Sequence, residues 1–113
     1  MKEGGKDSEP KSVEIRFGMV FARWFEKKCS IYVVIDVGKS NWFETSAMMQ
    51  VNGKVAFCLP GTAAPEYVNL VLGQLTKEQI LEGYDNWYEE PTPKIIVDEI
   101  NKNAAKPPRT INY

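Results

Sequence analysis

The first long hydrophobic stretch of the chain, residues 13–37, carries two overlapping patterns. Part of it alternates apolar residues at every second position, which predicts a strand, and part repeats them every three or four residues, which predicts a buried helix. The run at residues 31–35 is rich in β-branched side chains and favours a strand. The charged cluster Glu26-Lys27-Lys28 fits either one exposed helical turn or a connecting turn. Periodicity alone therefore leaves helix and strand open over this stretch.

The middle of the chain has the signals of loops and turns. Residues 38–47 are mostly small and polar and predict a loop. Asn52-Gly53 lies between two apolar runs and predicts a hairpin or tight turn within 48–57, because both residues tolerate positive φ. Cys58-Leu59-Pro60-Gly61 follows, and we expect regular structure to end there because proline and glycine interrupt it.

The second half predicts three helices. Pro65 fits the first turn of one helix, whose apolar face would comprise Tyr67, Val68, Val71, Leu72 and Leu75. Thr76 and Gln79 match a capping box that begins a second helix. Thr92 and Pro93 fit the start of a third helix, which buries Ile96, Val97 and Ile100. Residues 103–113 predict irregular chain, with Pro107-Pro108 preventing any further helix.

Length and composition favour one small domain that binds rather than catalyses. The 113 residues are 43% hydrophobic, which supports a core over 13–113 behind a polar tail, 1–12, that we expect to be disordered. Fourteen basic and fifteen acidic residues nearly cancel, so no nucleic-acid partner is expected. No histidine is present, which argues against an enzyme and, with only two cysteines, against a zinc site. No apolar run is long enough to span a membrane.

Two candidate chemistries have weak support. Gly38-Lys39-Ser40 resembles the end of a phosphate-binding loop, but the glycine that this motif needs five residues earlier is replaced by Val33. Carboxylates four residues apart in 77–90 could be assigned to a hydrolase, yet such spacing on one helix usually marks a solvated face. We therefore predict no catalytic residue, cofactor or metal ligand.

The same acidic segment has a second interpretation as a binding element. Residues 77–90 combine five acidic groups with interleaved aromatic residues, and only one lysine. Exposed carboxylates steer a basic partner, and rigid aromatic rings anchor it. An alternative is that Tyr84 and Trp87 pack in the core. The predicted partner-binding residues are Glu78, Glu82, Asp85, Trp87, Glu89 and Glu90.

The two cysteines, Cys29 and Cys58, also allow two interpretations. They could be buried free thiols, because cysteine packs as a small hydrophobic residue. They could instead form one bridge, which would imply an oxidising compartment. The sequence does not decide between these states.

Two short motifs carry a family resemblance. Phe57-Cys58-Leu59-Pro60 resembles the Cys-aliphatic-Pro motif that precedes a helix in the Rap/Tai-type periplasmic immunity proteins of type VI secretion systems. Upstream, Cys29-Ser30-Ile31-Tyr32 resembles that family's helical Cys-x-Gly-Tyr element, with Ile31 in place of the glycine. The resemblance covers roughly residues 20–107 and ends near Pro107.

The resemblance implies a fold, a function and a compartment. It implies an all-α domain related to periplasmic acid-stress chaperones, with a Cys29–Cys58 disulfide. The short hairpin near 48–57 expected from Asn52-Gly53 would be part of this domain, and an α+β domain is the alternative fold. It implies a periplasmic immunity protein that binds and blocks a secreted antibacterial toxin, with a peptidoglycan amidase as one candidate. The alternative function is a chaperone-like protein that binds unfolded chains. A cytoplasmic location and a homodimer also remain open.

Overall fold

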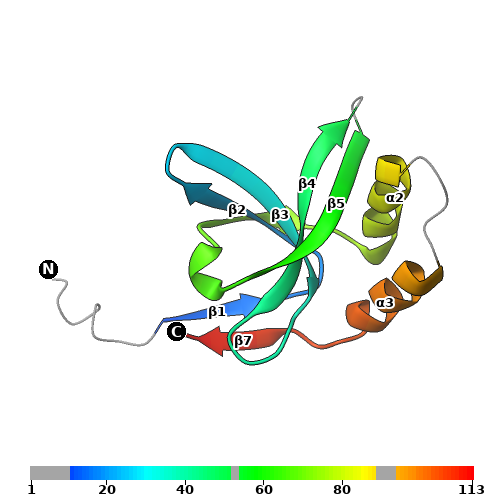
Figure 1. Ribbon diagram of the computed structural model, residues 1–113. Helices are drawn as coiled ribbons and strands as arrows, with labels where there is room; N and C mark the ends of the chain where they lie inside the picture. The colour runs from blue at the N-terminus through cyan, green and yellow to red at the C-terminus, as the bar shows by residue number, and fades with distance from the viewer. Residues whose placement is uncertain (1–10, 52–53, 89–93) are drawn as a thin grey trace, which may run out of the picture.

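A computed structural model describes residues 11–51, 54–88 and 94–113, and strands dominate it (Figure 1). A two-stranded antiparallel sheet pairs β1 (Ser12–Ile15) with β7 (Arg109–Asn112). A second antiparallel sheet has the order β5-β4-β3-β2-β6. Its strands are β2 (Met19–Phe25), β3 (Lys28–Asp36), β4 (Phe43–Val51), β5 (Lys54–Ala63) and β6 (Leu70–Gln74). The helices are η1 (Pro65–Tyr67), α2 (Lys77–Tyr88) and α3 (Lys94–Ala104).

The prediction of an all-α fold is wrong, because residues 13–37 form strands rather than a helix. The structure matches the α+β alternative. The apolar stretch is ambiguous because residues 19–22 of β2 and 33–36 of β3 are buried on both faces of the sheet, so their sequences lack clear alternation. Val20 and Val33 pack on one face, while Phe21 and Val34 pack on the other.

Two hydrophobic clusters lie on the two faces of the five-stranded sheet. On one face α2 and α3 pack against it, and they lie together at one side of the molecule in Figure 1. That cluster contains Val20, Val33, Ile35, Phe57, Ile80, Tyr84 and Ile100. On the other face the β1–β7 pair contributes Ile15 and Ile111 to a cluster with Met19, Phe21, Val34, Val37, Phe43 and Ala63. The sheet is therefore the central layer of the fold.

The middle of the chain forms longer strands than predicted. Regular structure does not end at residues 58–61, because β5 continues through Pro60 and Gly61. A proline is tolerated there since β5 is an edge strand, and the register with β4 shifts between Ser46 and Met48. The predicted loop at 38–47 is shorter, because β4 begins at Phe43. Asn52-Gly53 lies outside the described residues, but β4 and β5 pair on either side of it.

Two of the three predicted helices are confirmed. The capping box is formed as expected: the Gln79 amide donates to Thr76 Oγ1 (3.2 Å), and the Thr76 amide donates to Gln79 Oε1 (2.8 Å). The third helix is α3, which buries Ile100, whereas its predicted start at Thr92 and Pro93 lies outside the described residues.

The predicted helix beginning at Pro65 is wrong. It ends after the single turn η1, and the chain continues into β6, which pairs with β2. The glycine at position 73 contributes to this outcome, because glycine is unfavourable inside a helix. The prediction of an irregular C-terminus is also wrong, because β7 pairs with β1 there. Within the described ranges, none of the helices has the length and apolar character needed to cross a membrane.

Candidate functional site

The predicted acidic binding element is only partly visible. Glu78 and Glu82 are exposed on α2, and the Glu78 carboxylate lies 3.9 Å from the Lys77 ammonium. Asp85 and Trp87 belong to α2, but their side chains lie outside the described residues, as do Glu89 and Glu90. The structure therefore places two of the six predicted residues on an exposed helix face.

Tyr84, the aromatic residue interleaved with these acids, belongs to the core. It is buried, and its ring centroid lies 5.6 Å from that of Phe57 on β5. The interpretation in which Tyr84 packs in the core is thus confirmed.

The predicted Cys29–Cys58 bridge is not formed. Cys29 is a free, exposed thiol on β3, while the side chain of Cys58, on β5, lies outside the described residues. Strand β4 runs between β3 and β5, which sets their backbones about 10 Å apart. A disulfide needs Cα atoms within about 7 Å, so the sheet order itself separates the two cysteines.

The end of the β2–β3 hairpin gathers exposed aromatic and basic side chains. A two-residue turn at Glu26-Lys27 joins the strands, and Glu26 has a φ of 57°. The pairs Arg23↔Ser30 and Phe25↔Lys28 alternate with Trp24↔Cys29, so successive pairs face opposite sides of the hairpin. Phe25 is 64% exposed and Trp24 is 51% exposed. Such large apolar rings in water are typical of interaction surfaces.

One face of this hairpin forms an open pocket of about 190 Å³. We call it, together with Tyr67 of η1, the hairpin surface. Its residues are Arg23, Phe25, Lys28, Ser30, Tyr32 and Tyr67. Strand pairing places its β2 and β3 members on one side, because residues opposite each other in an antiparallel pair share a face.

A stacked arginine is central to the hairpin surface. The Arg23 guanidinium carbon lies 3.9 Å from the Tyr67 ring centroid and 5.8 Å from that of Phe25. Asn69 holds this arrangement in place: its Oδ1 accepts a hydrogen bond from the Trp24 backbone amide at 2.6 Å, and its backbone amide donates to the Ala22 carbonyl at 3.0 Å. These bonds attach the segment after η1 to β2, and so keep Tyr67 beside Arg23.

The hairpin end is locally basic. Arg23, Lys27 and Lys28 outnumber the single acid Glu26. Within the part of the chain that the structure describes, the Arg23 guanidinium takes part in no hydrogen bond or ion pair. An arginine stacked on an aromatic face keeps its in-plane N–H donors available for a carboxylate. The hairpin surface can therefore receive a negatively charged group beside an aromatic contact.

Strand β6 forms a second exposed region next to the hairpin. It is at the end of the five-stranded sheet, and among the described residues it pairs only with β2. Its register with β2 shifts, so that Leu72 has no opposite residue there. Leu70, Val71 and Leu72 are 51%, 53% and 50% exposed. β6 thus presents apolar side chains along an open edge.

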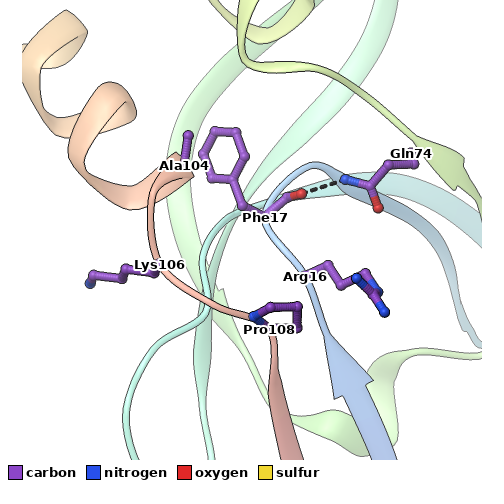
Figure 2. A pocket seen from close by; sticks show the side chains of 6 residues that line it. All are labelled: Arg16, Phe17, Gln74, Ala104, Lys106 and Pro108. Carbon is purple, nitrogen blue, oxygen red and sulfur yellow. Dashed lines mark hydrogen bonds between the residues drawn. The ribbon is translucent and has the colours of Figure 1, made fainter.

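A larger pocket of about 480 Å³ lies where the chain passes from β1 to β2, near the segment that follows α3. Figure 2 shows its six lining residues, with the Gln74 amide donating to the Phe17 carbonyl. Its two cations, Arg16 and Lys106, extend away from each other on opposite sides of Pro108. Arg16 is paired with Glu14 at 2.8 Å, and Lys106 with Asp36 at 2.9 Å. This pocket therefore offers no convergent charged groups.

Two carboxylates on neighbouring strands form the remaining cluster. Asp36 of β3 lies opposite Glu44 of β4, and Lys106 pairs with Asp36. Burial raises the pKa of Glu44, the charge of Asp36 raises it further, and Lys106 lowers it. Among the described residues, no three ligand-type side chains gather into a group that could hold a metal ion. The cluster attaches the segment after α3 to the sheet.

The hairpin surface was missed because residues 13–37 were expected to form a helix. The signal was present, since Trp24-Phe25 and Lys27-Lys28 flank a single acidic residue at a two-residue turn.

Comparisons with protein-family models, curated proteins and solved structures find no match to this chain.

Proposed function

We propose that this protein is a binding module that attaches to another protein through its hairpin surface. The observation that carries the proposal is the Arg23 guanidinium stacked on Tyr67, beside exposed Phe25 and Lys28. Tyrosine and arginine are enriched among the few residues that supply most of the energy in protein interfaces, and phenylalanine is enriched in their composition. The surface is preorganised, because strand pairing and Asn69 hold it in place.

The partner is a protein segment that presents carboxylates next to an apolar or aromatic side chain. A carboxylate accepts two parallel N–H bonds from the edge of the arginine, while the rings cover the apolar group. Single-stranded nucleic acid is the competing class of ligand, since it also uses aromatic and basic groups. A protein is favoured because the whole chain is slightly acidic, and because Trp24 and Phe25 face opposite sides rather than forming one stacking platform.

The narrower hypothesis, an immunity protein that blocks a secreted toxin, stays a prediction within this proposal. This hypothesis no longer rests on a helical fold or a disulfide. The acidic segment 77–90 predicted a basic target, whereas the basic hairpin surface favours an acidic target. The chaperone alternative has less support. It required the apolar segment 17–37 to be accessible, whereas Val20, Phe21, Val33 and Val34 are buried.

The proposal is tested by selecting binders from a random peptide library displayed on phage. Selected peptides are synthesised and their affinities measured by fluorescence polarisation against the parent protein and Arg23→Gln. We expect enrichment of aspartate and glutamate beside aromatic residues. Arg23→Gln should weaken binding about tenfold or more, because losing a charge-assisted pair costs roughly 1.5–3 kcal/mol.

Lys102→Gln is the matched control, because Lys102 is an exposed cation on α3, outside the hairpin surface. It should leave peptide affinity unchanged. A labelled single-stranded oligonucleotide is tested in parallel. Tighter binding of the oligonucleotide than of any selected peptide would overturn the proposal, as would equal losses in Arg23→Gln and Lys102→Gln.

A further inference from the structure

The two edges of the five-stranded sheet differ in how they are protected. At one edge, β5 contains Pro60, which lacks a backbone donor. Proline is a common way to keep an edge strand from pairing. At the other edge, β6 has neither proline nor charge, and all five of its residues are exposed. Among the described elements, β6 is therefore the edge strand whose backbone is open to pairing with a further strand.

The composition of β6 suits a second copy of the same strand. In an antiparallel two-fold pair the residue on the axis meets its own equivalent and its neighbours meet residues of the same short segment, so a charge near the axis would lie close to its own copy and repel it. The residues Leu70–Gln74 are all uncharged, and Leu70, Val71 and Leu72 offer apolar contacts. A charged partner segment would find no complementary charge on β6 itself.

We propose that two copies of the chain associate through β6, in antiparallel register, to form one continuous ten-stranded sheet. The β5 edges lie at the outer ends of that sheet, where Pro60 opposes further addition. Association therefore closes at a dimer and does not continue into a fibre. The new backbone hydrogen bonds satisfy the open edge of β6, and the leucine and valine side chains lose contact with water.

The dimer leaves the hairpin surfaces free. β6 runs antiparallel to β2, so Leu70 lies at the hairpin end and Gln74 at the opposite end of the strand. Pairing about Leu72 sets Leu70 of one copy near Gln74 of the other. The two basic hairpin ends therefore point in opposite directions, which separates their like charges. The dimer and the peptide binding described above can succeed or fail independently.

The test is sedimentation equilibrium of the purified full chain over a wide concentration range. We expect a monomer–dimer equilibrium, and at least a tenfold higher dimer dissociation constant for Leu72→Lys, which would place two ammonium groups face to face. Ile95→Lys is the matched control: Ile95 is 77% exposed on α3, and the substitution makes the same chemical change outside β6. Circular dichroism shows whether each variant is folded.

Hydrogen exchange gives an independent measurement that does not depend on any substitution. The amides of residues 70–74 should exchange more slowly at high protein concentration than at low concentration. A chain that stays monomeric up to about millimolar concentration would overturn the proposal. So would a dimer that Ile95→Lys dissociates as readily as Leu72→Lys does, or one in which β6 gains no protection.

Discussion

The ammonium group of Lys106 lies 2.9 Å from a carboxylate oxygen of Asp36, which is 70 residues earlier in the sequence. The Gly38 amide also donates to Asp36, at 3.3 Å. Arg109, three residues after Lys106, donates to the Val37 carbonyl at 2.9 Å. The Lys106 and Arg109 bonds attach the segment after α3 and the start of β7 to the end of β3. Glu44, opposite Asp36, is the second carboxylate at this point.

This arrangement makes stability depend on the protonation of Glu44. Its pKa is raised from the ordinary value of 4.5, first by burial and then by Asp36. Protonated Glu44 therefore favours the folded state: its contribution is full below the unfolded pKa and is lost as pH rises through the folded pKa. We expect Glu44→Gln to be more stable than the parent at pH 7, and its free energy of unfolding to change less between about pH 4 and 7.

Urea denaturation at a series of pH values measures this effect. Glu66→Gln is the control, because Glu66 is an exposed carboxylate on η1. If the Glu44→Gln and parent curves stay parallel across that range, the assignment of the pH dependence to Glu44 is wrong.

Gly83 allows α2 to lie close to β5. A Cβ atom at this position would overlap the ring of Phe57, which is fully buried. Alanine gains about 1 kcal/mol of intrinsic helix propensity over glycine. Overpacking typically costs about 1–3 kcal/mol, which exceeds that gain over most of its range, so we expect Gly83→Ala to lower the free energy of unfolding by up to about 2 kcal/mol.

Thermal or urea denaturation of the Gly83→Ala variant tests this. Gly61→Ala serves as control, because a Cβ there meets no atom within 4 Å. Combining Gly83→Ala with Phe57→Leu should cost less than the sum of the single changes, since both act on one contact. Strict additivity would show that the two residues do not interact.

The capping box at the start of α2 makes a measurable contribution to stability. Thr76→Ala removes the oxygen that accepts the Gln79 amide, and we expect a loss of about 1 kcal/mol in the free energy of unfolding. Thr76→Ser keeps the hydroxyl and should retain most of the parent stability. Equal losses in both variants would mean that the hydroxyl is not the stabilising group.

Cys29 should behave as an accessible free thiol. Because its side chain is exposed, iodoacetamide should alkylate it in the folded protein, and Cys29→Ser should change stability by less than about 0.5 kcal/mol. The intact mass before and after reduction should be equal. A gain of about two daltons on reduction would reveal an intramolecular disulfide, and would contradict a sheet in which β4 separates the two cysteines.

The sequence predicted the elements whose signals are local. Thr76 and Gln79 are three residues apart and are sufficient to mark the start of α2. The α3 helix follows from a short apolar stripe that includes Ile100. In each case a single stretch of chain contains the information.

Features that depend on distant pairing could not be predicted in this way. β7 has four residues, of which only Ile111 is buried, and it becomes a strand because β1 lies beside it. Residues 19–22 and 33–36 show no clear strand alternation because both faces of the sheet are covered there, by helices on one side and by β1–β7 on the other. The hairpin surface depends on pairing within that same sheet, so it could not be predicted while a helix was expected over this stretch.

The β1–β7 pair has a mechanical consequence. Lys11 and Tyr113 exchange backbone hydrogen bonds of 3.0 and 2.7 Å, so the chain enters and leaves the pair at the same end (Figure 1). A force that pulls these two residues apart acts across the strands and loads one bond at a time. We expect such a force to unzip β1 from β7 and uncover Ile15 and Ile111 before the five-stranded sheet yields. Under tension, we therefore expect the β1–β7 pair to separate at a lower force than the five-stranded sheet.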